Sequence, residues 1–75
     1  MVSVKILIDS VEKVKDFTSI LGKEEVECEI VDGIHIIDAK SIMGIFSLDL
    51  SKPLQLNIHT DNTELLDKIK DYIVK

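Results

Sequence analysis

The dipeptide Asp32-Gly33 lies between two apolar runs and is the strongest local constraint on how this 75-residue chain folds. Aspartate followed by glycine favours a two-residue type I′ turn, because both central residues of that turn need a positive φ. Residues 25–31 alternate acidic and apolar side chains before the turn, and residues 34–39 follow it. The sequence therefore predicts a β-hairpin made of strands 25–31 and 34–39.

The register of this hairpin decides which side chains face the core. A two-residue turn at Asp32-Gly33 pairs Ile30 with His35 and Cys28 with Ile37, which places these four side chains on the core face. The opposite, open face of the sheet then carries three further apolar residues, Val31, Ile34 and Ile36. Because bare apolar surface on a sheet invites pairing, we expect a monomer or a weak homodimer.

Apolar spacing places the other elements. Residues 2–8 alternate as in a half-buried strand, and a helical stripe follows from Val11 to Gly22. A short helix begins after Ser41, a fourth strand covers 54–58, and a last amphipathic helix runs from about residue 64 to the chain end. The order β-α-β-β-α-β-α predicts one α+β domain over residues 1–75. It is a two-layer, open-faced β-sandwich in which three helices cover a four-stranded antiparallel sheet.

Composition excludes several classes of function. Nine lysines, no arginine and fourteen acidic residues give a net charge of −5, which argues against direct nucleic-acid binding. No apolar run approaches the roughly 20 residues that span a bilayer, so no membrane insertion is expected. Cys28 is the single cysteine and the chain opens without a signal peptide, so we expect a cytoplasmic protein. The two histidines and this cysteine lack the spacing of a zinc site, and we expect no metal or cofactor.

The segment 38–48 carries the most specific signal for function. Ser41 is a good N-cap, because its hydroxyl can accept a hydrogen bond from a backbone N–H of the first turn. Ile42, Met43 and Phe46 share one side of this short helix. Two interpretations of each feature stay open: Ser41 is a cap alone or a cap that is also phosphorylated, and the three apolar residues are core or a partner surface.

Lys40-Ser41-Ile42-Met43-Gly44, followed by Ile45-Phe46-Ser47-Leu48, resembles the regulatory-serine segment of HPr, the phosphocarrier of the bacterial sugar phosphotransferase system. The element order is similar to the HPr fold over the whole chain, and the resemblance implies the strand order 1-4-2-3. It also implies that Ser41 is similar to the serine modified by HPr kinase/phosphorylase. The family's docking surface for enzyme I, the kinase and a transcriptional regulator would fall on Lys40, Ile42, Met43 and Phe46.

The first helix departs from that family. HPr opens this helix with Gly-Ile-His-Ala-Arg-Pro-Ala, whose histidine carries the phosphoryl group. Here Lys13 stands in the place of the histidine and Lys15 in that of the arginine. An ammonium group has no lone pair to offer at neutral pH, so the carrier chemistry is lost. We expect a non-catalytic regulatory or adaptor protein, similar to the catabolite-repression HPr paralogue, which also lacks the histidine and keeps the serine.

Two other interpretations remain. A degenerate HPr fold can serve as a constitutive binding or dimerisation module with no phosphorylation. A histidine carrier that uses His59, at the end of the fourth strand, is the weaker one, because no arginine or paired base lies near it in sequence. Cys28 alternates with apolar neighbours, which indicates a small core residue rather than a nucleophile.

Overall fold

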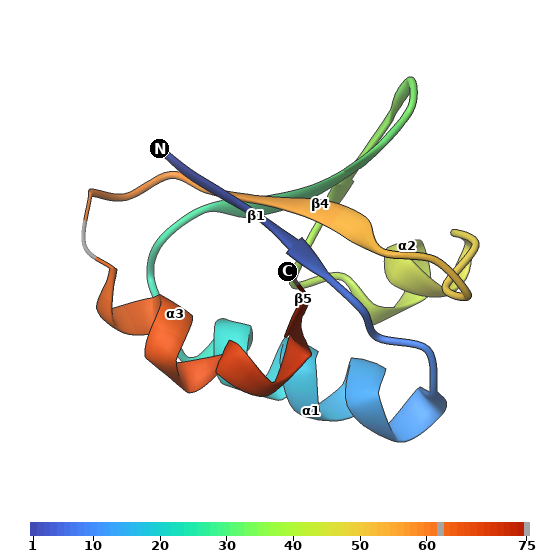
Figure 1. The fold of residues 1–75 in the computed structure, drawn as a ribbon, viewed down its shortest axis with the longest axis horizontal. Coiled ribbons are helices and arrows are strands. Elements are labelled where there is room, and N and C mark those ends of the chain that lie inside the picture. Colours follow the sequence, from blue (N-terminus) through green and yellow to red (C-terminus); the bar gives the residue numbers. More distant parts are fainter. Residues whose placement is uncertain (62, 75) are drawn as a thin grey trace.

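A five-stranded antiparallel sheet organises the computed structural model, which describes residues 1–61 and 63–74 (Figure 1). The elements are β1 (Val2–Ile6), α1 (Val11–Gly22), β2 (Cys28–Asp32), β3 (His35–Asp38), α2 (Ile42–Phe46), β4 (Leu54–Ile58), α3 (Glu64–Lys68), the 3₁₀ helix η1 (Lys70–Tyr72) and β5 (Ile73–Val74). The helices lie on one side of the sheet, with α1 and α3 beneath β1 and β4 (Figure 1). The α+β class and the two layers are as predicted.

The predicted four-stranded sheet is wrong by one strand. The order is β3-β2-β4-β1-β5, which keeps the expected order 1-4-2-3 of the first four strands and adds β5 beside β1. The last helix was expected to reach the chain end, but α3 stops at Lys68. Ile73 and Val74 instead pair with β1, and the N–H of Leu7 donates to the Tyr72 carbonyl at 2.8 Å. Two consecutive β-branched residues favour this extended end over another helical turn.

The hairpin turn lies one residue later than predicted. Asp32 pairs with His35 and Ile30 with Ile37, so the turn residues are Gly33 and Ile34. Gly33 has φ +62°, and no non-glycine residue of the described chain has a positive φ. This is the pattern of a type II′ turn, which needs positive φ only at its first central position. The pairing is shifted by two residues, so the expected faces are kept: Ile30 faces the core and Ile36 the open side.

The core fills the space between the sheet and the helices. It combines the inward side chains of β1, β2 and β4 with one stripe of each helix, and Cys28 belongs to it at 5 % exposure. Phe17 of α1 meets Tyr72 edge to face, with ring centroids 5.7 Å apart. Ser10 caps α1, since its hydroxyl accepts from the Lys13 N–H at 3.2 Å. No helix in the described ranges is long and apolar enough to cross a membrane.

Gly44 lets α2 lie close against β3. A Cβ at this position would stand 2.6 Å from Cγ2 of Ile37 and 3.2 Å from the Ser41 hydroxyl oxygen. Ile45, on the inward side of α2, is fully buried. The absence of a side chain at Gly44 therefore sets the distance between this short helix and the sheet, and with it the position of Ser41.

Gly44→Ala should destabilise the protein although alanine is the better helix former. The added methyl group overlaps a branched side chain that cannot rotate away, and such overpacking costs about 1–3 kcal/mol. Gly22→Ala is the matched control, because nothing lies within 4 Å of its added Cβ. There alanine should stabilise by about 0.5–1 kcal/mol. Urea unfolding midpoints of both variants measure this, and equal effects would contradict the close contact.

Candidate functional site

Ser41 stands at the start of α2 with its side chain in the capping position. Its hydroxyl oxygen accepts from the Gly44 N–H at 3.2 Å, and its backbone φ and ψ are extended. Its own N–H donates to the Asp38 carbonyl at 2.9 Å, which ties the cap to the end of β3. Ser41 is half-buried. The predicted cap is confirmed, and whether the residue is phosphorylated stays a prediction.

The side chain of Lys40 is held by a hydrogen bond to another part of the chain. Its ammonium group donates to the Glu24 carbonyl at 2.6 Å, in the loop that follows α1. Its backbone N–H donates to a carboxylate oxygen of Asp38 at 2.9 Å. The residue thus fastens the β3–α2 connection to the end of α1, and its side chain is half-buried.

The three apolar residues proposed as a partner surface differ in exposure. Met43 is 79 % exposed and Phe46 41 % exposed, both far above the level of core residues. Ile42 is half-buried and packs against the core. The exposed apolar surface of α2 therefore consists of Met43 and Phe46, and Ile42 forms its inner border. Below we call Met43 and Phe46 the α2 patch.

Lys13 and Lys15 lie on the first two turns of α1 and are exposed. The ammonium group of Lys13 forms an ion pair with Asp9 at 3.0 Å. This hydrogen bond and the lysine charge together lower the pKa of the Asp9 carboxyl. α1 contains no histidine that could take over the role of a phosphocarrier residue. Both histidines of the chain belong to the sheet region.

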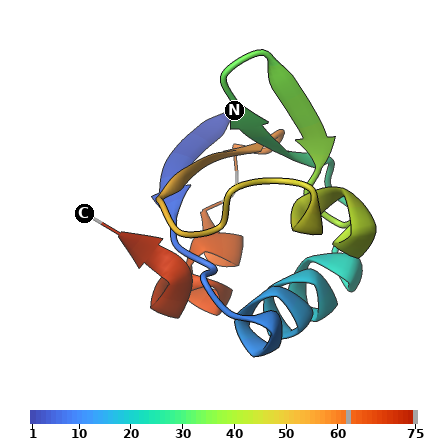
Figure 2. The same cartoon turned by 90° about the vertical axis from the view of Figure 1, so that its right-hand side faces the viewer.

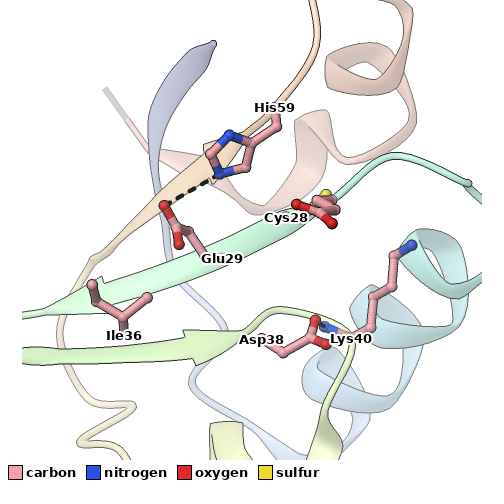
Figure 3. A pocket seen from close by; sticks show the side chains of 7 residues that line it. Cys28, Glu29, Ile36, Asp38, Lys40 and His59 are labelled. Carbon is pink, nitrogen blue, oxygen red and sulfur yellow. Dashed lines mark hydrogen bonds and ion pairs between the residues drawn. The ribbon is translucent and has the colours of Figure 1, made fainter.

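A hollow of about 320 Å³ lies on the open side of the sheet, where β2, β3 and the end of β4 meet (Figure 3). Its lining is mostly charged: Glu27, Cys28, Glu29, Ile36, Asp38, Lys40 and His59. The imidazole Nε2 of His59 is 3.3 Å from a carboxylate oxygen of Glu29, and the two side chains point toward each other (Figure 3). No paired base lies near His59 in the sequence, and the fold supplies this carboxylate from β2.

Asn57 holds the same carboxylate oxygen of Glu29 that faces His59. It is the buried polar residue of β4, 6 % exposed, and its amide nitrogen donates to Glu29 at 3.3 Å. Its amide oxygen accepts from Ser3 at 2.8 Å and from Gln55 at 2.9 Å. The alternation of β4 predicted a polar outer face but gave no sign that Asn57 would be enclosed by its neighbours.

The chemistry of the hollow is limited by its residues. Burial raises the pKa of the Cys28 thiol, so little of the nucleophilic thiolate exists at neutral pH. Among the described residues, no group of three or more histidine, cysteine, aspartate and glutamate side chains has the arrangement to hold a metal ion. The hollow is therefore a mostly charged surface whose one thiol is not activated.

Comparison with known proteins finds a similar structure but no similar sequence family. No family model matches the sequence, and no curated protein matches it. The crystal structure of HPr-C-His from Thermoanaerobacter tengcongensis is similar to this chain with a TM-score of 0.78 and 25 % sequence identity. The match covers 95 % of this chain and 89 % of that one. The chain therefore has an HPr-like α+β fold.

Proposed function

We propose that this chain is a non-catalytic, HPr-like regulatory or adaptor protein of the bacterial cytoplasm, linked to the phosphotransferase system. The observation that carries the proposal is the α2 patch beside a capping serine. Met43 and Phe46 expose apolar surface on a helix whose inward residue, Ile45, already fills the core. Exposed apolar residues that packing does not require are typical of a protein–protein contact.

Phosphorylation of Ser41 is the regulatory step in this proposal. A phosphoserine adds about −1.5 to −2 charges and three strong acceptor oxygens. At the first turn of α2, the free backbone N–H groups favour that charge, so the fold should be kept. The change would instead alter the surface next to the α2 patch, which a kinase, a transcriptional regulator or a phosphotransferase-system enzyme would contact.

The carrier function of HPr is not part of the proposal. Lys13 takes the position that the resemblance assigns to the phosphorylated histidine, and its ammonium group is paired with Asp9. A protonated amine cannot attack a phosphoryl group. The protein would act through binding, without a catalytic step of its own.

A constitutive binding module without phosphorylation is the second candidate. The observation that favours it is a separate exposed apolar surface around β3, where Ile34 is 94 % and Ile36 64 % exposed. This surface lies on the sheet and needs no change at Ser41 to be available.

Incubation with HPr kinase/phosphorylase and ATP should modify Ser41, which intact-mass measurement detects. Ser41→Ala should remove the modification and cost about 0.5–2 kcal/mol of stability through the lost cap. Ser41→Asp should keep the fold, because aspartate caps about as well as serine. Ser47→Ala is the control, since this hydroxyl lies at the other end of α2. An unmodified wild-type protein would leave the constitutive module as the better account.

Met43→Ala should be nearly neutral for stability and should weaken capture of the partner in a pull-down. The side chain is largely solvated, so its truncation leaves no cavity, whereas truncating a buried methionine costs about 2–5 kcal/mol. Val11→Ala is the matched control, because Val11 is 55 % exposed on another helix. A large fall in the melting temperature of Met43→Ala, with partner capture unchanged, would show that the residue serves packing alone.

A further inference from the structure

β3 forms one edge of the sheet. It pairs with β2 on one side, and no strand in the described part of the chain pairs with its other side. An edge strand presents unpaired backbone N–H and C=O groups to any extended chain that approaches it. Figure 2 shows the β2–β3 hairpin projecting beyond the rest of the sheet, away from α1 and α3.

The register identifies the backbone groups at this edge. The Ala39 N–H donates to the Cys28 carbonyl at 3.1 Å, so Ala39 bonds toward β2. Backbone bonds alternate along an antiparallel pair, and Ile37 and His35 therefore also bond toward β2. The N–H and C=O of Ile36 point to the free edge. The Asp38 carbonyl on the same edge already accepts from the Ser41 N–H.

β3 is a short edge strand with one charged residue, Asp38, but it lacks two common blocks to pairing. Natural edge strands are commonly blocked by lysine or proline, and β3 contains neither. Ile36 is 64 % exposed on its open face, and Ile34, at the turn, is 94 % exposed. These two isoleucines offer apolar contacts to a strand laid beside them.

The charges near the edge are mainly negative. Glu29 and Asp38 lie directly opposite each other on β2 and β3, and like charges in that position are destabilising. Glu27 also lines the hollow beside them. The nearby lysine is already committed, because the Lys40 ammonium group donates to the Glu24 carbonyl, and the imidazole of His59 lies 3.3 Å from Glu29. A basic side chain placed opposite Asp38 would relieve this repulsion.

We propose that the free edge of β3 binds an extended segment of a partner protein in which an apolar and a basic side chain lie two residues apart, on the same face of the segment. Backbone bonds to Ile36 would hold the segment, an apolar side chain would cover Ile36, and a basic one would lie opposite Asp38. A second copy of this chain fits less well. Its β2–β3 hairpin would bring the same two carboxylates, on a molecule that also carries a net charge of −5. The proposal does not depend on phosphorylation of Ser41.

The test uses the full chain and a seven-residue peptide whose second, fourth and sixth residues are lysine, valine and valine, with threonine at the other positions, so that lysine and valine share one face. NMR titration should show shifts centred on the amide signals of Ile36, Asp38 and Glu29, weakening as salt is raised. Two control peptides replace lysine by glutamate or valine by glycine. Both should bind at least tenfold more weakly, because one loses the charge match and the other the apolar contacts.

Variants of the protein separate edge pairing from general attraction. Ile36→Pro removes the outward N–H and is tolerated at a sheet edge, so it should abolish binding with the fold retained. Ile36→Thr keeps the N–H and should bind detectably. Asp38→Asn should weaken binding about 1.5- to fivefold, the range of one cross-strand charge pair. Glu12→Gln removes an equal charge at an exposed position of α1 and should leave peptide binding unchanged.

Three results would overturn the proposal. The first is no binding of the valine–lysine peptide at millimolar concentration. The second is equal binding by Ile36→Pro and Ile36→Thr, both folded by circular dichroism, since that excludes backbone pairing. The third is shifts of the Ile36 and Asp38 signals that depend on protein concentration alone, which would identify a second copy as the occupant.

Discussion

The close approach of α2 to β3 is the contact on which the rest of the surface depends. Gly44 faces a methyl group of Ile37 at a distance that leaves no room for a side chain. This contact buries Ile45, brings the Ser41 hydroxyl over the N–H of Gly44, and turns Met43 outward. A helix of five residues has little stability of its own, so its position is set by this packing.

Asp38 connects the two surfaces of the molecule. Its carbonyl receives the N–H of Ser41 at the start of α2, and its carboxylate receives the N–H of Lys40. On β3 the same residue lies opposite Glu29. The α2 patch and the edge of β3 are therefore joined by one short connection, whose other anchor is the bond from the Lys40 ammonium group to the Glu24 carbonyl.

The sequence predicted the two layers and the Ser41 cap well, because these follow from local patterns, whereas the order of the first four strands came from the resemblance to HPr. Alternation identified the core faces, and the serine before Ile42 identified the start of α2. The turn was misplaced by one residue, because Gly33 can take the first or the second central position and only pairing of β2 with β3 decides. The last helix was overextended, because the stripe of Leu65, Ile69 and Tyr72 continues in helical spacing.

The hollow on the open face could not be predicted from the sequence in the same way. Glu27, Glu29, Asp38 and His59 come from different strands or strand ends, and they meet only through the pairing of β2 with both β3 and β4. In the sequence, the alternating glutamates indicate only an ordinary solvated face of a strand. The enclosure of Asn57 likewise depends on side chains from β1 and β2 that lie far away in sequence.

An HPr-like fold without phosphoryl transfer is the central claim, and phosphorylation by enzyme I tests it most directly. The protein is incubated with enzyme I and phosphoenolpyruvate beside an HPr that has the histidine, and intact mass is measured before and after acid treatment. Lys13 predicts no gain in mass while the HPr control is modified. An acid-labile, base-stable phosphate on His35 or His59 would contradict the account.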